Sequence, residues 1–407
     1  MPRRVLCIAA VATVLVTGAC TSGGGPAPTG HPSPPLPATT STTAVTPSAS
    51  SPGNAGTSSS ARPTKAASAQ SVFAAMSERQ RVGQLLMVDC PSTGVADATV
   101  SAITDNDVGS VILDGTTHSG SSAIRSLTGA LQRHAPRTAG LLIATDQEGG
   151  IVQRLQGPGF STIPNAVQQG GRSPSTLRSD ARTWGTQLKR AGVDVDLAPV
   201  LDTVPAGGGS NPPIGDLDRE YGHTPSSVRS HGVAVMQGLL DARVAPTVKH
   251  FPGLGRVAGN TDTTSGVTDS VTTRDDPYLA PFLAAVQAGV PFVMMSTAIY
   301  SRIDPGTPAA FSKTIVTGML RGDLGFRGLV ISDDLGAARQ VSSRSPGQRA
   351  VDFVQAGGDV VLTVVAGQAQ TMTSALLAKA QSDSSFKKKV DAAALLVLQT
   401  KQKLGLL

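Results

Sequence analysis

Short apolar runs recur along the chain from about residue 72, and longer stretches with helical spacing separate them. Eight runs have the length and composition of buried strands: 85–88, 108–113, 141–145, 193–201, 244–250, 290–296, 329–332 and 359–364. Five of the gaps between them have helical patterns: 176–191, 226–240, 278–288, 312–324 and 348–356. A strand followed by a helix, repeated about eight times, predicts an α/β fold of the (β/α)8 TIM-barrel type. A doubly wound open sheet is the main alternative.

Charged residues follow the carboxyl ends of several predicted strands. Asp146, Asp202 and Asp333 come at or just after the third, fourth and seventh runs, and Lys249 and His250 end the fifth. Active sites of barrel enzymes lie at this end of the strands. Loop formation or helix capping would explain any one of these residues, but a shared site explains the set better.

The motifs that the sequence lacks narrow the chemistry. No glycine-rich phosphate loop follows a predicted strand, no paired His or Cys motif offers a metal site, and no Gly-x-Ser-x-Gly segment is present. We therefore expect neither a metal nor an organic cofactor. Carboxylates around a concave mouth suit glycosidic chemistry, in which one stabilises or attacks the anomeric carbon while another group handles the proton of the leaving group.

Four motifs resemble glycoside hydrolase family 3, in its bacterial single-domain β-N-acetylhexosaminidase branch. They are DQEGGIVQR at 146–154, DVDLAPVLD at 194–202, KHFPG at 249–253 and LVISDDL at 329–335. The resemblance begins at residue 76 and continues to near the C-terminus. It implies a single catalytic barrel and a retaining hydrolase of β-linked N-acetylhexosamine that takes part in peptidoglycan turnover.

The resemblance also implies a role for each matching residue. Asp333 is the expected nucleophile. Substrate binding is expected from five residues: Asp146, Arg154, Arg219, Lys249 and His250. The Arg219 assignment rests on a loop that is slightly longer here than in the family, and a structural role behind the strand end is the alternative for His250.

The acid/base motif of the family is replaced in this chain. The family has Asp-Ser-His on a loop after the Lys-His block, whereas this chain has Asn260-Thr261-Asp262. We favour Asp262 as the general acid/base, because carboxylic acids do this work in most glycosidases. Two alternatives stay open: residues 261–265 position water or substrate for a transferase or a slow hydrolase, or the chain is a catalytically weak or inactive glycan-binding surface lipoprotein. A different sugar specificity is also open.

The N-terminal residues predict export. Residues 1–20 combine Arg3 and Arg4 with a short apolar segment that ends at Cys20, which resembles a lipobox and makes Cys20 the predicted lipidation site. An ordinary signal peptide cut before Cys20, with secretion, is the alternative. Residues 21–70 are rich in Ser, Thr and Pro and contain no acidic or aromatic residue, which predicts a disordered tether before a barrel domain at 71–407. We therefore expect a lipoprotein at the outer face of the cell membrane.

Composition adds information about partners. The formal net charge is +6, but Arg3, Arg4, Arg62 and Lys65 are the only charged residues before Glu78, so 30 basic and 28 acidic residues remain, a net charge of +2. A nearly neutral body with 3% aromatic residues gives little support to nucleic-acid binding. We expect an amino-sugar glycan or muropeptide as substrate, the membrane as a partner through the lipid anchor, and a monomer.

The scarcity of Cys, Trp and Tyr has two further consequences. Cys90 is the only cysteine of the predicted body, which excludes an intrachain disulfide there, and we expect it to be a buried apolar residue. Trp184 lies in a predicted outer helix. Sugar recognition is therefore expected to rest on charged residues instead of an aromatic platform.

Overall fold

The computed structural model of the chain describes residues 68–136 and 139–407. The predicted export signal, the predicted lipidation site Cys20 and nearly all of the predicted tether lie outside the described residues. The first helix, α1 (Ala69–Ala75), begins at the end of the range predicted for the tether. Among the described helices, none combines the length and the apolar character that crossing a membrane requires.

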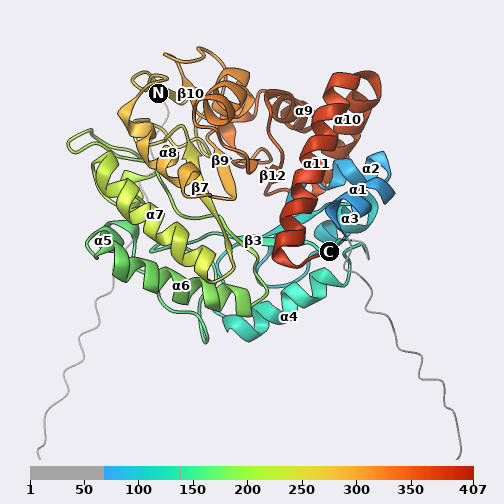
Figure 1. Cartoon of the computed structure of the whole chain (residues 1–407), viewed down its shortest axis with the longest axis horizontal. Coiled ribbons are helices and arrows are strands. Elements are labelled where there is room, and N and C mark those ends of the chain that lie inside the picture. Colours follow the sequence, from blue (N-terminus) through green and yellow to red (C-terminus); the bar gives the residue numbers. More distant parts are fainter. Residues whose placement is uncertain (1–67, 137–138) are drawn as a thin grey trace, which may run out of the picture. The chain divides into compact units, whose positions relative to one another are not determined.

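Eight parallel strands form the central sheet, in the order β11-β9-β7-β6-β3-β2-β1-β12 (Figure 1). A parallel bridge between Ile331 and Val360 joins the two end strands, and the Ser332 amide donates to the Val360 carbonyl over 3.0 Å. Strands that follow one another in the chain are therefore neighbours all the way around, as in a (β/α)8 barrel. The predicted fold class is confirmed, and the open-sheet alternative is wrong.

Each of the eight predicted runs overlaps one strand of this sheet. The bounds are β1 Leu86–Pro91, β2 Ser110–Asp114, β3 Leu142–Thr145, β6 Val195–Asp196, β7 Ala245–Phe251, β9 Phe292–Met295, β11 Leu329–Ser332 and β12 Val361–Thr363. The fourth run was expected to span 193–201, yet only two of its residues form regular strand. Pro199, which has no N–H, interrupts the regular ladder, although its carbonyl accepts from Lys249 and the Leu201 amide donates to the Lys249 carbonyl.

Helices surround the barrel (Figure 1). The α-helices that follow α1 are α2 Glu78–Gly83, α3 Asp97–Asn106, α4 Gly120–Gln132, α5 Ala166–Gly170, α6 Pro174–Arg190, α7 Pro225–Asp241, α8 Ala280–Gln287, α9 Pro346–Ala356, α10 Ala369–Ser382 and α11 Ser384–Leu404. Four of the five predicted helices correspond to α6, α7, α8 and α9. The fifth, at 312–324, is a π-helix over Thr314–Asp323.

Three outer helices begin with the same local signal. Ser173, Thr224 and Ser345 each accept a hydrogen bond from an amide in the first turn of α6, α7 and α9, and a proline follows each cap. The cap satisfies one of the free amides at the helix start, and proline at this position needs no N–H. Each helix therefore starts at a sharply defined residue after a loop at the carboxyl end of the barrel.

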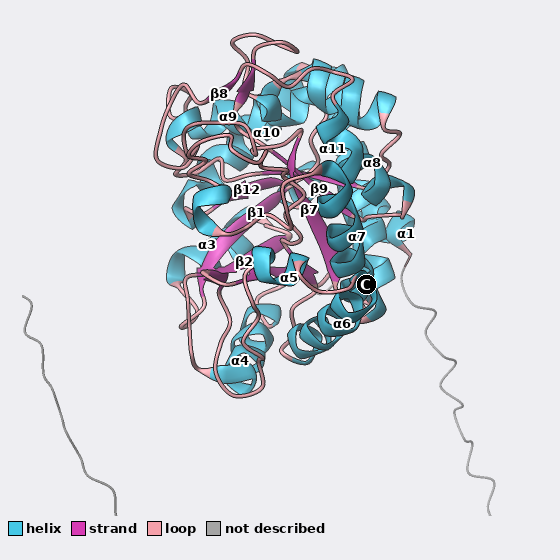
Figure 2. Ribbon diagram, turned by 90° about the vertical axis from the view of Figure 1, so that its left-hand side faces the viewer, coloured by secondary structure: helices cyan, strands magenta, loops and turns pink. Residues whose placement is uncertain are grey.

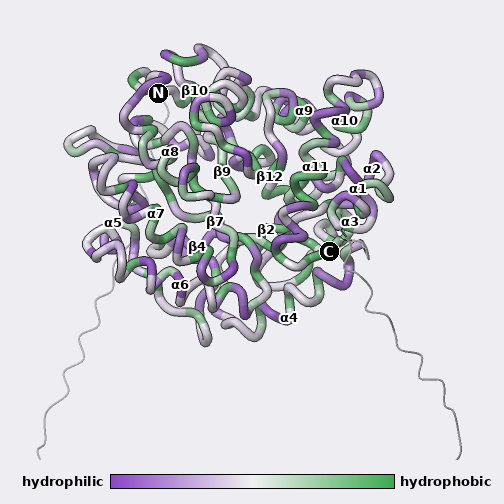
Figure 3. Tube along the Cα trace, in the orientation of Figure 1, coloured by the Kyte–Doolittle hydropathy of each residue, from purple (hydrophilic) through white to green (hydrophobic). Residues whose placement is uncertain are grey.

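The core has two layers because side chains of a strand alternate between the two faces of the sheet. Met87 and Ile112 belong to the cluster inside the barrel, whereas Leu86 and Val88 belong to the cluster between the sheet and the helices. Hydrophobic segments accordingly gather at the centre of the molecule in Figure 3. Cys90 is buried and unpaired, as predicted, and Trp184 is buried in the outer layer on α6.

Two small sheets extend the loops of the barrel. The hairpin of β4 (Gln147–Gly149) and β5 (Val152–Gln153) follows β3 directly, and β8 (Thr268–Asp269) pairs in parallel with β10 (Ile299–Tyr300). Figure 2 shows β8 and the C-terminus on opposite sides of the body. The carboxyl ends of the barrel strands therefore lie on a side rich in loops, and α11 ends on the other side of the body.

Candidate active site

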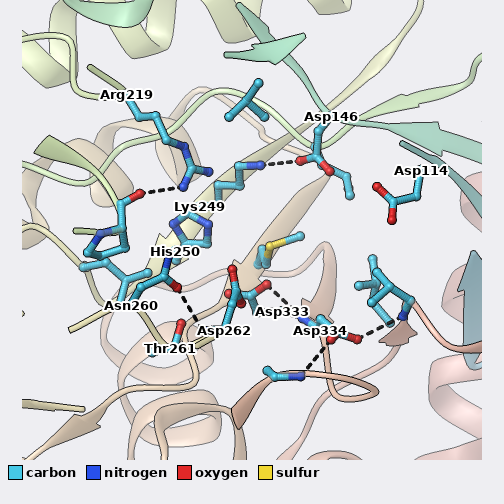
Figure 4. A pocket seen from close by; sticks show the side chains of 18 of the residues that line it. Asp114, Asp146, Arg219, Lys249, His250, Asn260, Thr261, Asp262, Asp333 and Asp334 are labelled. Atoms are coloured by element: carbon cyan, nitrogen blue, oxygen red, sulfur yellow. Dashed lines mark hydrogen bonds and ion pairs between the residues drawn. The ribbon is translucent and has the colours of Figure 1, made fainter. Parts of the chain in front are cut away.

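A cavity of about 450 Å³ opens at the carboxyl ends of the strands (Figure 4). It is lined by all seven residues predicted for catalysis or binding: Asp146, Arg154, Arg219, Lys249, His250, Asp262 and Asp333. They come from four different strand ends and two loops. No Phe, Tyr or Trp is among the residues that line the cavity in the described part of the chain. The barrel brings these seven charged and polar residues together from positions up to 187 residues apart (146 to 333).

Lys249, on β7, is the centre of an ionic network on one wall of the cavity. Its Nζ lies 2.5 Å from Asp146 Oδ1 and 2.6 Å from Glu148 Oε1, and the side chain is buried. Burial alone would lower the pKa of Lys249, but the two carboxylates outweigh it and raise this pKa above its usual value. The lysine is therefore charged throughout the physiological pH range and is held in one place by two anions.

Glu148 also fixes Arg219, which approaches from the loop between β6 and α7. The guanidinium forms a bidentate pair with Glu148, with Nη2 2.6 Å and Nε 2.8 Å from the two carboxylate oxygens. Its Nη1 donates to the Pro213 carbonyl over 2.7 Å. Burial would raise the pKa of Glu148, yet Arg219 and Lys249 hold it well below its usual range. One buried carboxylate thus orients two cations at the cavity.

His250 is oriented by Asp202, a fully buried residue beyond the end of β6. The ring Nδ1 lies 2.7 Å from Asp202 Oδ2, and Oδ1 accepts from the amides of His250 and Leu254 at 3.1 and 2.8 Å. Because an ionised carboxylate only accepts, Nδ1 carries the hydrogen and Nε2 is the ring nitrogen left for another partner. Three hydrogen bonds to one carboxylate also shape the turn that carries the Lys-His block.

The two aspartates after β11 have different environments. The Asp334 carboxylate accepts hydrogen bonds from four backbone amides, those of Gly336, Ala337, Ala338 and Val364, at 2.7–3.0 Å. Asp333 accepts one, from the Asp334 amide at 2.8 Å, and its own amide donates to the Met295 carbonyl. Asp334 is therefore committed to holding the loop, whereas Asp333 has a free carboxylate oxygen at the cavity.

Asp262 lies across the cavity from Lys249, on the loop between β7 and β8 (Figure 4). Its amide donates to Asn260 Oδ1 over 2.9 Å. The protein atoms around its carboxyl, and then the negative charge of Asp333, raise the pKa of Asp262 to about 6. The residue remains accessible to solvent. Asp262 is therefore open to the cavity, and its carboxyl keeps its proton to a higher pH than an ordinary aspartate does.

Arg154 follows β5 at the rim of the same cavity. Its Nε lies 3.9 Å from Asp114 Oδ1 and has no hydrogen-bond partner among the described residues. The Arg154 side chain is partly exposed at the cavity wall, so its guanidinium can reach a ligand. Asp114, at the end of β2, also lines the cavity.

Sequence reasoning did not assign a role to Glu148 or Asp202. Both had a recognisable signal, since Glu148 follows Asp146 by two residues and Asp202 ends the fourth apolar run. Their partners lie 71 and 48 residues away in the chain. Only the neighbouring positions of β3, β6 and β7 in the barrel bring these pairs into contact.

A barrel of this kind, with carboxylates and fixed cations around one open cavity at its strand ends, has the features of a glycoside hydrolase. The described residues contain no group of three or more His, Cys, Asp or Glu side chains placed to hold a metal ion. Residues 77–399 match the model of the glycosyl hydrolase family 3 N-terminal domain. The chain belongs to glycosyl hydrolase family 3, so the predicted family is confirmed.

Proteins with related sequences and structures support this assignment. A β-hexosaminidase of Xanthomonas oryzae pv. oryzae is 33% identical over 290 residues, which cover 66% of this chain and 81% of the relative. The crystal structure of a β-N-acetylhexosaminidase from Beutenbergia cavernae is 48% identical, with a TM-score of 0.78 over 80% of this chain and 99% of that one. A family 3 β-N-acetylglucosaminidase from Paenibacillus sp. is 31% identical, with a TM-score of 0.75 over 82% of this chain and 63% of that one.

Proposed function

We propose that the chain is a retaining β-N-acetylhexosaminidase in which Asp333 is the nucleophile and Asp262 is the general acid/base. The substrate class is supported by the relatives, which are named as hexosaminidases and acetylglucosaminidases. The single observation that carries the mechanism is the contrast between the two carboxyls of one cavity. Asp262 holds its proton to a pKa of about 6, partly because of the charge of Asp333. Pairs of this kind divide acid and nucleophile roles in glycosidases.

In the first step, a carboxylate oxygen of Asp333 attacks the anomeric carbon while the bond from that carbon to the leaving oxygen breaks. The carboxyl of Asp262 transfers its proton to the leaving oxygen, so the released sugar departs as a neutral alcohol. The product is a glycosyl ester on Asp333. Asp333 has a free carboxylate oxygen for this attack because the Asp334 amide occupies only the other one.

In the second step, Asp262 is ionised and acts as a base. It takes a proton from a water molecule while the water oxygen attacks the anomeric carbon and the ester bond to Asp333 breaks. Both carboxyls return to their starting protonation states, and inversion at each step gives net retention at the anomeric carbon.

Substrate binding in this proposal falls to the fixed cations and their partners. Lys249 and Asp146 form a charged pair that offers both a donor and an acceptor to neighbouring sugar hydroxyls. Arg154 supplies a partly exposed guanidinium, and Arg219 and His250 complete the wall. Since these groups are already held by Glu148 and Asp202, little ordering is required when substrate binds.

We place this activity at the outer face of the cell membrane, in peptidoglycan turnover, with an amino-sugar glycan or muropeptide as substrate. The support comes from the sequence, namely the lipobox-like segment that ends at Cys20 and the linker-like composition of residues 21–70. Secretion without lipid stays the alternative. A monomer suffices, because all the residues that the proposal uses come from one chain.

Hydrolysis and covalent trapping test the proposal together. Residues 21–407 are assayed on 4-nitrophenyl β-N-acetylglucosaminide and on the matching β-glucoside, alongside Asp333→Asn and the control Asp352→Asn, which alters a partly exposed aspartate of α9 outside the cavity. We expect the acetylated substrate to be preferred and only Asp333→Asn to be inactive. A 5-fluoro-N-acetylglucosaminyl fluoride should add one sugar to the peptide that contains Asp333, as detected by mass spectrometry. Equal inertness of wild type and Asp333→Asn, with retained binding of muropeptides, would make the chain a glycan-binding protein.

A further inference from the structure

A second hollow, of about 530 Å³, lies at the opposite end of the barrel from the active-site cavity. It is formed where β7, β9 and β11 begin and where α7, α8 and α11 end, and we call it the basal groove. Its apolar wall includes Val244, Pro291, Phe326, Leu396 and Leu404. An apolar hollow on the outside of a barrel is unusual for a surface that meets only water, and suggests a ligand or a surface that covers it.

Three cations surround this apolar wall: Arg243, Arg327 and Lys403. All three are exposed, and none is paired with a carboxylate among the described residues. No acidic residue lines the basal groove in the described part of the chain, whereas five aspartates line the active-site cavity. The groove therefore combines an apolar floor with a rim of one sign of charge, which is complementary to an amphiphile with an anionic head.

The beginning of the folded body lies on the same side. The amide of Ala69 donates to Gln402 Oε1 over 2.8 Å, and Gln402 is next to Lys403 in the last turn of α11. The apolar cluster of Val72 with Leu398 holds α1 against α11. Figure 2 shows α1 and the C-terminus on one side of the body. The described part of the chain therefore begins beside the basal groove and away from the catalytic cavity.

We infer that the basal groove docks onto a bilayer containing anionic phospholipid. The three cations would contact lipid phosphates, and the partly exposed Leu396 and Leu404 would meet the boundary between head groups and acyl chains. Each Lys or Arg near an anionic surface contributes to binding independently of protein-specific contacts. This orientation turns the catalytic cavity away from the bilayer, toward glycan. It depends neither on hydrolysis nor on a lipid at Cys20.

Vesicle binding by the unlipidated chain, residues 21–407, tests the inference directly. We expect sedimentation with vesicles of equal parts phosphatidylglycerol and phosphatidylcholine, little sedimentation with pure phosphatidylcholine, and release by salt. The triple variant Arg243→Gln, Arg327→Gln, Lys403→Gln should bind the anionic vesicles at least tenfold more weakly. Its rate of hydrolysis of the 4-nitrophenyl substrate should equal that of wild type, which shows that it is folded.

A matched control has the same loss of charge elsewhere on the body. Arg229→Gln, Arg302→Gln, Lys388→Gln alters an early turn of α7, the loop after β10 and an early turn of α11, and it should bind vesicles as wild type does. Equal weakening by both triple variants would reduce the effect to net charge and overturn the inference. So would equal binding of wild type to both kinds of vesicle, or binding of soluble laurate without any binding of vesicles.

Discussion

The amide of Arg339 donates to the carbonyl oxygen of Asp262 over 3.0 Å, so the loop that carries the proposed acid is joined to the loop that follows the proposed nucleophile. The next residue strengthens this junction. The Gln340 amide donates to the Thr261 carbonyl, and its side chain pairs with both the amide and the carbonyl of Val267. The acid-bearing loop is thus held at its centre and at its end by the chain that leaves β11.

Loss of the Gln340 side chain should move Asp262 without touching substrate. Gln340→Ala leaves the buried amide of Val267 unpaired, which should lower the free energy of unfolding by about 1–3 kcal/mol. We expect kcat/KM for a poor leaving group, such as a disaccharide, to fall about tenfold, and that for a 4-nitrophenyl glycoside to change little. Gln348→Ala, on the exposed face of α9, is the control and should change neither. Equal losses on both substrates would assign Gln340 a purely structural role.

The pH profile should report the proton on Asp262. Because the pKa of this carboxyl is raised to about 6, the protonated form is present below that pH and is lost as the pH rises through it. We expect kcat/KM for a poor leaving group to fall about tenfold per pH unit above about pH 6, since only the acid form can protonate the leaving oxygen. The measurement is a pH–rate profile for wild type and Asp262→Asn. An alkaline limb that persists unchanged in the variant would belong to another group.

Asp196 provides a test of burial without catalysis. It is buried on β6, and burial raises its pKa to about 8, so the folded chain keeps this proton over a range in which the unfolded chain, with a usual pKa of 3.8, has released it. The stabilising effect is complete below pH 3.8, the pKa in the unfolded chain, and it is lost as the pH rises toward 8. The loss amounts to at most about 1.4 kcal/mol per pH unit. Urea unfolding at pH 5 and pH 8 should show a smaller loss of stability for Asp196→Asn than for wild type. The control Asp202→Asn alters another buried aspartate and should be less stable than wild type at both pH 5 and pH 8. If wild type and Asp196→Asn lose the same unfolding free energy between pH 5 and pH 8, the raised pKa of Asp196 is contradicted.

Ile151 should select the aglycone. It stands between β4 and β5, lines the catalytic cavity and is 65% exposed, in a cavity that offers no aromatic platform among the described residues. Partial burial of this side chain by an apolar aglycone is expected to contribute about 1 kcal/mol. Ile151→Ser should therefore raise KM about fivefold for aryl glycosides and leave kcat unchanged. The control is Val271→Ser, which removes an exposed apolar side chain outside the cavity. The same KM for all three proteins would exclude this contact.

The sequence predicted the strands well and the helices less completely, for a physical reason. Strands of a closed barrel are buried on both faces, so they appear as short continuous apolar runs. Helices such as α3 and α10 have a polar outer face and weaker periodicity, and α4 and α11 were also not predicted. The strand that differs most from its predicted range is β6, which Pro199 shortens.

The sequence predicted those residues of the candidate site that belong to recognisable motifs. It did not predict the roles that arise from contacts between different strands. Asp333 and Asp334 are adjacent and chemically identical in sequence, and four backbone amides distinguish them only in the folded chain. Likewise, Glu148 acquires its role from Lys249 and Arg219, which belong to other segments of the barrel. The raised pKa of Asp262 also depends on protein atoms that the loop meets after folding.

The central claim is that Asp262 replaces the acid/base motif of the family, and azide rescue tests it most directly. Asp262→Asn is assayed on 4-nitrophenyl β-N-acetylglucosaminide with and without azide, next to Asn260→Ala and His250→Gln. Azide needs no general base, so it should attack the glycosyl ester, raise the rate of the Asp262→Asn variant at least tenfold and give the β-glycosyl azide, while neither control is rescued. Full activity of Asp262→Asn on a disaccharide without azide, or rescue of His250→Gln in its place, would contradict the claim.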